Sequence, residues 1–244
     1  MKDHFSSHAD DYVKYRPTYP SDLYRFLEAE VPNKNVAWDC GTGNGQVAFQ
    51  LAKRFCQVYA TDISQQQLDM ALTKDNIEYS VQAAEETTFS NDLFDLVIVA
   101  QAIHWFNFEK FYAEVRRTAR KNARICVVGY GLIKICPEVD NIIGDFYSSV
   151  IRPYWDDERK FIDENYKTIP FPFKEIQTPK FVNKHRWNLN HLIGYLNTWS
   201  AVKRFIKENN HNPIDDLKIQ IEKYWGDTEI KQVNFPILLR LGKI

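Results

Sequence analysis

The chain has 244 residues, 44% of them hydrophobic, and a formal net charge of −1. This length suits one α/β domain with an added lobe or lid, and the balanced charge argues against a nucleic-acid partner or a membrane surface. No apolar run is long enough for a membrane-spanning helix, and the first residues lack the apolar core of a signal peptide. The four cysteines form no C-x-x-C pair, which favours reduced, buried thiols, no metal site and a cytoplasmic location.

The first 32 residues precede the first predicted strand and contain several tyrosines. Tyr12, Tyr15 and Tyr19 are spaced so that several of them share one side of a helix, until Pro17 interrupts the pattern. A second helix follows. The segment is either a helical packing element or a lid of two helices over a ligand. As a lid, it would bring Arg16 close enough for a bidentate contact with a carboxylate.

A glycine-rich stretch, residues 36–46, stands at the centre of the predicted site. A short apolar run ends in Asp39, glycines follow at alternate positions, and a helical pattern begins at Val47. This indicates a buried strand, a tight turn and a helix N-terminus that lets a ligand approach the backbone closely. The dinucleotide fingerprint needs glycine where Gln46 stands, and the Asp39 carboxylate would repel a diphosphate. A carboxylate here suits an amine-bearing ligand without phosphate, such as S-adenosylmethionine.

Two further strands complete the first half of the predicted sheet. Residues 57–62 end in Asp62, about twenty positions after the glycines, where folds of this kind hold a ribose diol. A helix is expected after Ser64. A short third strand, residues 77–80, leads into an acidic segment at residues 81–86.

The fourth predicted strand, residues 94–99, is an apolar, β-branched run that we expect to be buried and parallel. Ligands of open α/β sheets bind beyond the carboxyl ends of the strands, so Gln101, Ala102, His104 and Trp105 should lie at the ligand edge. His104 is either a general base or a wall of the pocket. A helix from Phe108 and a strand at residues 123–130 complete the cofactor-binding half, residues 33–130.

Residues 131–173 and 188–228 depart from this alternation and carry helical stripes. Insertions near a ligand edge commonly shape substrate access, so we expect both to form a substrate cap. The last strands are predicted at residues 174–187 and 230–244, and Pro236 favours an edge position or a bulge. The aromatic residues considered as pocket walls, with core packing as the alternative, are Trp105, Tyr154, Trp155 and Trp199.

The glycine turn, with Asp39 and Asp62, resembles motif I of the class I S-adenosylmethionine-dependent methyltransferases. Other segments resemble one small-molecule group of that family, methyltransferase type 11, which is related to trans-aconitate methyltransferases. These segments extend over nearly the whole chain: residues 4–7, 15–20, 171–173, 195–202, 224–227 and 235–242. The resemblance implies one α/β domain with a Rossmann-like, doubly wound sheet of seven strands. Their order would be 3-2-1-4-5-7-6, with strand 7 antiparallel and a helical cap.

The resemblance also implies which residues contact each ligand. It implies that the methionine part is held by Asp39, Gly41 and Gly43, and the ribose by Asp62. The sulfonium would lie over Gln101, with Ala102 beside it. The adenine would be flanked by Ile63, Ala84 and Glu85, and the N-terminal side would be closed by Tyr12, Tyr15 and Arg16. The expected substrate pocket consists of His104, Trp105, Arg152, Tyr154, Trp155, Arg186 and Trp199.

The expected reaction is in-line transfer of a methyl group to an oxygen of a small molecule, with alignment and water exclusion as the protein's main tasks. A carboxylate acceptor needs no base at neutral pH, and Arg16, Arg152 or Arg186 would orient it. A hydroxyl acceptor would make His104 the leading base.

Other functions stay open at this point. The chain is also compatible with a non-catalytic S-adenosylmethionine-binding module and, less well, with an NAD-dependent oxidoreductase. Nucleic-acid methylation is disfavoured, because no N-P-P-Y-type tetrad follows the fourth strand. We expect a monomer or a homodimer.

Overall fold

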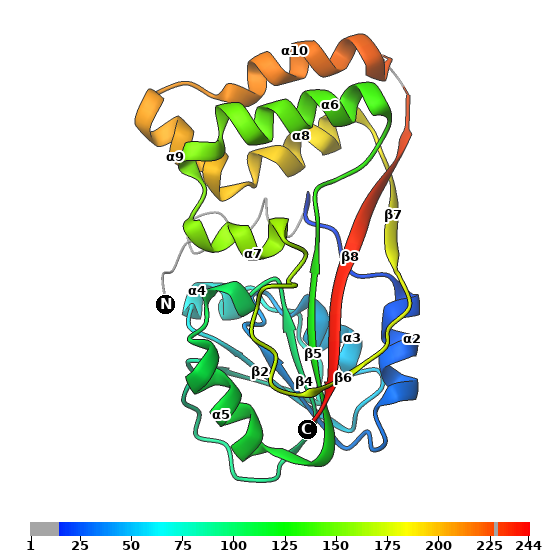
Figure 1. The fold of residues 1–244 in the computed structure, drawn as a ribbon, viewed down its shortest axis with the longest axis vertical. Coiled ribbons are helices and arrows are strands. Elements are labelled where there is room, and N and C mark those ends of the chain that lie inside the picture. Colours follow the sequence, from blue (N-terminus) through cyan, green and yellow to red (C-terminus); the bar gives the residue numbers. More distant parts are fainter. Residues whose placement is uncertain (1–14, 227–228) are drawn as a thin grey trace.

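The computed structural model describes residues 15–226 and 229–244 and arranges them in two parts (Figure 1). A β-sheet flanked by helices forms one part, and a layer of helices lies beyond one end of its strands. The strands are β1 (Val36–Cys40), β2 (Gln57–Asp62), β3 (Ile77–Val81), β4 (Phe94–Ala100), β5 (Ala119–Tyr130), β6 (Lys174–Ile176), β7 (Val182–Trp187) and β8 (Lys231–Lys243). The α-helices are α2 (Ser21–Glu30), α3 (Gln46–Leu51), α4 (Gln65–Asp69), α5 (Phe108–Thr118), α6 (Pro137–Asp145), α7 (Lys160–Asp163), α8 (Leu189–Asn197), α9 (Ser200–Asn209) and α10 (Pro213–Trp225).

The strand order is β3-β2-β1-β4-β5-β8-β6, and β7 also pairs with β8. Strands β1 to β5 pair with one another in parallel, whereas β8 is antiparallel to β5, β6 and β7. Counting β6 and β7 as the sixth strand and β8 as the seventh gives the predicted order 3-2-1-4-5-7-6. The predicted α/β fold and its antiparallel last strand are therefore confirmed.

The predicted sixth strand, residues 174–187, is wrong as a continuous strand. The structure divides it into β6, which pairs Ile176 with Leu241, and β7, which pairs Val182 with Pro236. Pro179 lies between the two segments and lacks the N–H that a ladder hydrogen bond requires. The chain therefore leaves β8 after Ile176 and rejoins it further along, where β8 extends towards the helical layer (Figure 1).

Both faces of the sheet are covered by helices. On one face, Leu27 of α2 and Leu51 of α3 pack in a buried cluster with Ile98 of β4. On the other face, Phe111 of α5 packs in a cluster with Val97 of the same strand. Successive strand residues point to opposite faces, so β4 is buried on both, as its apolar sequence predicted.

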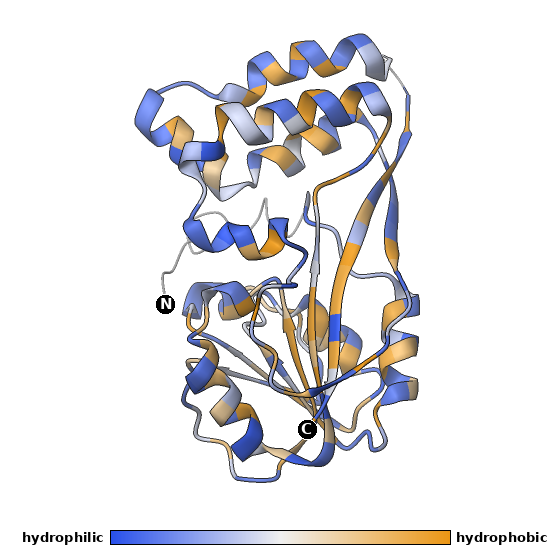
Figure 2. Cartoon of the chain, viewed as in Figure 1, coloured by the Kyte–Doolittle hydropathy of each residue, from blue (hydrophilic) through white to orange (hydrophobic). Residues whose placement is uncertain are grey.

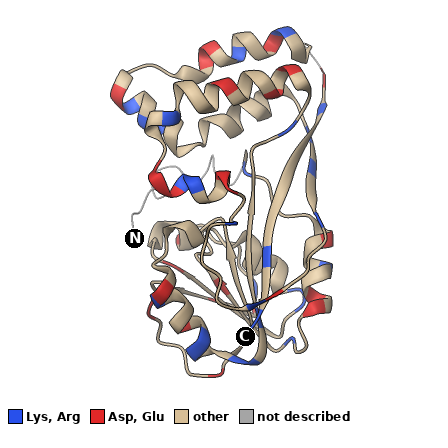
Figure 3. Ribbon diagram, viewed as in Figure 1, with Lys and Arg blue, Asp and Glu red and all other residues tan. Residues whose placement is uncertain are grey.

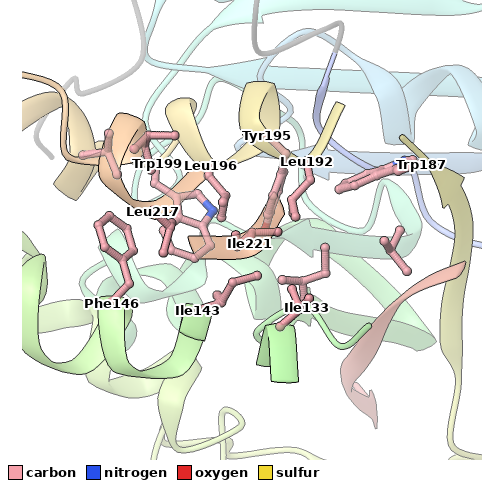
Figure 4. Packing of buried hydrophobic residues seen from close by; sticks show 14 of the residues in the cluster. Ile133, Ile143, Phe146, Trp187, Leu192, Tyr195, Leu196, Trp199, Leu217 and Ile221 are labelled. Atoms are coloured by element: carbon pink, nitrogen blue, oxygen red, sulfur yellow. The ribbon is translucent and has the colours of Figure 1, made fainter. Parts of the chain in front are cut away.

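The helical layer has a hydrophobic core of its own (Figure 4). Side chains of α6, α8 and α10 point towards one another there, among them Ile143, Leu196 and Ile221. Apolar and hydrophilic residues alternate along these helices (Figure 2). Charged residues gather on helices and loops and are few on the parallel strands (Figure 3). Trp187 of β7 and Phe235 of β8 belong to the same cluster and join the layer to the sheet.

Helix α6 continues into one turn of π-helix, residues Phe146–Val150. The sequence predicted a single helical stripe through both. The extra residue in a π turn changes which side chains face inward, and such turns are frequent at functional sites. Among residues 15–226 and 229–244, no helix has the length and apolar character that crossing a membrane requires.

Candidate functional site

The glycine turn follows β1, whose two neighbours, β2 and β4, lead to opposite halves of the sheet. Chain order reverses at this point, and a crevice opens there beyond the carboxyl ends of the strands. The local sequence therefore places the turn, the end of β2 and the end of β4 around one space.

The turn depends on left-handed backbone conformations. Gly41, Gly43 and Gly45 have φ values of +70°, +56° and +76°. A Cβ atom on Gly41 would lie 2.7 Å from the Cβ atom of Ala102, and one on Gly45 would lie 2.1 Å from the Tyr79 hydroxyl oxygen. Glycine is thus needed for both conformation and space.

Asp62, at the end of β2, fixes the turn from the ligand side. Its carboxylate accepts hydrogen bonds from the backbone N–H groups of Gly43, at 2.8 Å, and Ser64, at 3.0 Å. The side chain also lines the cavity described next. A carboxylate oxygen accepts more than one hydrogen bond. Asp62 therefore suits the recognition of hydroxyl groups while it holds the backbone.

The first cavity lies over this turn. The predicted cofactor residues in its wall are Arg16, Gly41, Gly43, Asp62, Ile63, Ala84, Gln101 and Ala102. Arg16 and Asp62 are the charged residues of that wall within the described part of the chain. Polar residues that the sequence did not single out also line it: Thr42, Asn44, Gln67, Gln82 and Tyr130.

Asp39 lies behind the turn and is fully buried rather than lining the cavity. One carboxylate oxygen accepts hydrogen bonds from Ala48 N–H at 2.8 Å and the Thr42 hydroxyl at 2.6 Å. The other oxygen has no hydrogen-bond partner in the described structure. Burial is the main cause that raises the pKa of Asp39 to about 7. The first turn of α3 attracts the carboxylate, because helix N-termini favour anions.

Two other predicted cofactor residues lie outside the cavity wall. Tyr15 packs edge-on against His191, with ring centroids 5.3 Å apart. The Glu85 carboxylate accepts a hydrogen bond from Asn107 N–H at 2.9 Å, which directs it to the loop before α5. Tyr12 lies outside the described residues.

Arg16 holds the N-terminal segment against the helical layer. Its Nε donates to the Thr198 hydroxyl at 2.9 Å, one terminal nitrogen to the Thr198 carbonyl at 3.2 Å, and the other to the Tyr130 hydroxyl at 3.2 Å. The guanidinium also lies 5.5 Å from the centre of the Tyr195 ring. Every nitrogen of this side chain is therefore engaged within the protein.

A second cavity adjoins the first. The two share Arg16, Gln101, Trp105 and Tyr130. Its other walls come from the loop after β5, from the segment between α6 and α7, from α7, and from α8 and the start of α9. They include Leu132, Trp155, Asp156, Arg159, Ile162, Tyr195 and Trp199. The predicted pocket residues that line it are His104, Trp105, Trp155 and Trp199.

Gln101 separates the two cavities in a strained conformation. It directly follows β4 with φ of +56°, which is uncommon for a residue other than glycine. Its backbone N–H donates to the Val128 carbonyl at 2.9 Å, and its amide nitrogen donates to the Tyr130 carbonyl at 3.4 Å. Residues held in such conformations cluster at functional sites.

His104 is nearly buried against aromatic neighbours. Its ring lies 4.9 Å from that of Trp105 and 6.4 Å from that of Tyr166. Its Nδ1 has no hydrogen-bond partner in the described structure. Burial, followed by the charge of Arg159, lowers the pKa of His104 to about 3. The imidazole is thus neutral at physiological pH and is not oriented by a carboxylate.

Three predicted substrate-pocket residues do not reach either cavity. Arg152 and Arg186 are exposed, on a 3₁₀ turn (Arg152–Tyr154) and on β7. Tyr154 packs on Phe205 in α9, with ring centroids 5.0 Å apart. Arg159, which the sequence did not single out, lines the second cavity in their place. The signal for it is weak, because it is one charge in a run of charged residues.

Comparisons with known proteins agree with this fold and site. A family model described as a methyltransferase domain matches residues 38–127. A protein of Dictyostelium discoideum named as a methyltransferase is 34% identical over 99% of this chain and 95% of its own. A solved structure from Anaeromyxobacter dehalogenans, described as a type II methyltransferase, is 36% identical and covers 94% of this chain and 98% of its own, with a TM-score of 0.88. A methyltransferase structure from Bacillus halodurans, 18% identical over 92% of this chain and 99% of its own, shares the fold with a TM-score of 0.53.

The whole-chain matches confirm the predicted family, enzyme class and cofactor. The narrower resemblance to trans-aconitate methyltransferases stays a prediction. The chain belongs to the class I S-adenosylmethionine-dependent methyltransferases, with a type 11 methyltransferase domain.

Proposed function

We propose that the protein transfers a methyl group from S-adenosylmethionine in the first cavity to an oxygen of a small molecule in the second. The observation that carries this proposal is the wall that the cavities share, with Gln101 and Trp105 on it. Two ligands bound on either side of this wall would meet there. In-line transfer requires such a fixed meeting of the reacting atoms.

The first cavity fits this cofactor in its shape and charge. The glycine turn provides close access to backbone, which the methionine part would use at Gly41 and Gly43. Asp62 would accept hydrogen bonds from the ribose hydroxyls, and Ile63 with Ala84 would flank the adenine. The charged residues of the wall are Asp62, whose carboxylate would repel a phosphate, and Arg16, which already donates from every nitrogen within the protein. This charge pattern suits a cofactor without phosphate.

The acceptor side would work by orientation and exclusion of water. S-adenosylmethionine supplies a methyl group on a positively charged sulfur that leaves readily. Trp105, Trp155 and Trp199 would enclose the acceptor, and the residues above the β-sheet would close the space as a substrate cap. Gln101 would hold its amide beside the transfer path.

The environment of His104 favours an acceptor oxygen that needs no general base. A base works best when its pKa lies near the operating pH, and burial lowers that of His104 to about 3. No carboxylate orients its ring among the described residues. We therefore infer that His104 is a wall of the acceptor pocket. A carboxylate, ionised at neutral pH, is the oxygen that fits.

The test is incubation of the protein with S-adenosylmethionine that carries an isotope-labelled methyl group, together with separate pools of acids, alcohols and phenols. We expect S-adenosylhomocysteine to accumulate with the acid pool, together with a product that carries the labelled methyl group. Saturable cofactor binding without acceptor-dependent turnover in any pool would contradict catalysis. That result would favour a non-catalytic binding module instead.

A further inference from the structure

The second cavity contains a guanidinium whose outer edge is not bonded to the described protein. Arg159 ends a short 3₁₀ turn (Asp157–Arg159) just before α7. Its Nε donates to the Tyr147 hydroxyl at 2.8 Å and lies 3.6 Å from the Asp163 carboxylate. No hydrogen bond links its two terminal nitrogens to residues 15–226 or 229–244, and the side chain is 20% exposed.

Aromatic rings hold this guanidinium in place. Its central carbon lies 4.4 Å from the centre of the Trp155 ring and 5.4 Å from that of Tyr147. Stacking of this kind fixes the plane of a guanidinium and leaves its N–H groups able to donate two parallel hydrogen bonds to an anion. Tyr147 lies in the π turn after α6, so this irregular turn helps to set the direction of Arg159.

The other two charged side chains in the described wall of the second cavity use every nitrogen or oxygen in contacts within the protein. Arg16 donates from each of its nitrogens to Thr198 or Tyr130. Both oxygens of the Asp156 carboxylate accept hydrogen bonds from one terminal nitrogen of Arg204, each at 2.7 Å. The wall therefore offers one anchoring point for an anion, at Arg159, within the described part of the chain.

Aromatic side chains form a large part of the remaining wall, beside the polar residues Gln101, His104, Asp156 and Ser200. Trp105, Trp155, Tyr195 and Trp199 line the cavity, together with Ile162. Aromatic walls favour flat, apolar ligand bodies, because offset-stacked and edge-to-face contacts add to the burial of surface. A molecule with several carboxylates would leave the others without a cation in this wall, which is costly for buried charges.

We infer that the acceptor is a flat aromatic acid with one carboxylate, anchored by Arg159 and methylated on a carboxylate oxygen. This inference rests on the proposed function. The acceptor's carboxylate oxygen forms the new C–O bond while the bond between methyl carbon and sulfur breaks and its electron pair stays on sulfur. The products are a methyl ester and S-adenosylhomocysteine, and no proton is transferred.

The experiment compares wild type with Arg159→Met, Arg159→Lys and, as the matched control, Lys160→Met. Lys160 is the exposed next residue and carries the same charge. The probes are benzoate, cinnamate, their amides, and propane-1,2,3-tricarboxylate. Binding is measured by titration of the protein loaded with S-adenosylhomocysteine, and transfer is measured as kcat/KM with product identification.

We expect wild type to bind and methylate the aromatic acids and to reject the amides and the tricarboxylate. Arg159→Met should weaken acid binding ~10- to 100-fold, the range of a charge-assisted bidentate contact, and lower kcat/KM similarly. Arg159→Lys should recover part of the loss, since it keeps the charge without the fork. Lys160→Met should match wild type, and all variants should bind S-adenosylhomocysteine equally.

Several results would overturn the inference. They are equal binding of acids and amides, preference for the tricarboxylate, or the same loss in Lys160→Met. Absence of acid binding that depends on Arg159 would also overturn it. Binding that depends on Arg159 without any transfer would instead contradict the proposed function and leave the anion site standing. Unchanged binding of S-adenosylhomocysteine by Arg159→Met excludes misfolding as the cause of a loss.

Discussion

Replacement of Asp62 with alanine is expected to weaken the binding of S-adenosylhomocysteine by at least ~100-fold. The Asp62 carboxylate holds the N–H groups of Gly43 and Ser64, and it faces the cavity where a ribose would lie. Two ribose hydroxyls would donate hydrogen bonds to this carboxylate, and hydrogen bonds to a charged group contribute about 1.5–3 kcal/mol each. The loss of these two bonds corresponds to at least ~100-fold in affinity. Calorimetric titration of the purified variant measures the effect.

The matched control for this substitution is Asp69→Ala. Asp69 is exposed in the neighbouring helix α4, where its carboxylate accepts a hydrogen bond from Gln65 at 2.7 Å. We expect this variant to bind like wild type. If Asp62→Ala lost less than tenfold in affinity, or no more than Asp69→Ala, Asp62 would not hold the cofactor.

Replacement of Asp39 with asparagine is expected to change how stability depends on pH. Burial raises the pKa of Asp39 from 3.8 to about 7, so the folded protein keeps a proton that the unfolded chain releases. The stability linked to this proton is fully present below pH 4 and is lost as pH rises through 7. Between pH 5 and pH 8 wild type should lose about 3 kcal/mol of unfolding free energy relative to Asp39→Asn.

The pKa shift of His104 changes stability with pH in the opposite direction, and it is present in both proteins. Burial lowers its pKa from 6.5 to about 3, so the stability linked to it is present above 6.5 and is lost as pH falls. The two groups partly cancel in wild type, and Asp39→Asn should expose the loss at low pH that His104 causes. Urea unfolding at pH 5 and pH 8 measures both proteins. Parallel pH profiles for the two proteins would show that Asp39 titrates normally.

The first half of the fold was predictable because its signals are local. The apolar run of β4 and the glycines after β1 each specify a strand or a turn within a few residues, and the parallel strands follow from their alternation with helices. The same locality made Asp62 predictable as a residue of the ligand edge, since it ends a strand next to the glycine turn.

The rest of the site depends on contacts between distant parts of the chain. Asp39 lies near the end of the first strand, as predicted, but it does not line the cavity. Its carboxylate instead accepts a hydrogen bond from the N-terminal turn of α3. Arg159 reaches the acceptor side through a π turn and two short turns whose directions no periodicity reveals. Arg186 lies on a strand whose pairing with β8 points it to solvent.

The most direct test of the central claim is a calorimetric titration of the wild-type protein with S-adenosylhomocysteine, with NAD titrated in parallel. The cavity over the glycine turn, with Asp62 on its wall and Asp39 buried behind it, predicts saturable binding of S-adenosylhomocysteine and none of NAD. Binding of NAD in place of S-adenosylhomocysteine would contradict the assignment of this cavity and the chemistry inferred from it.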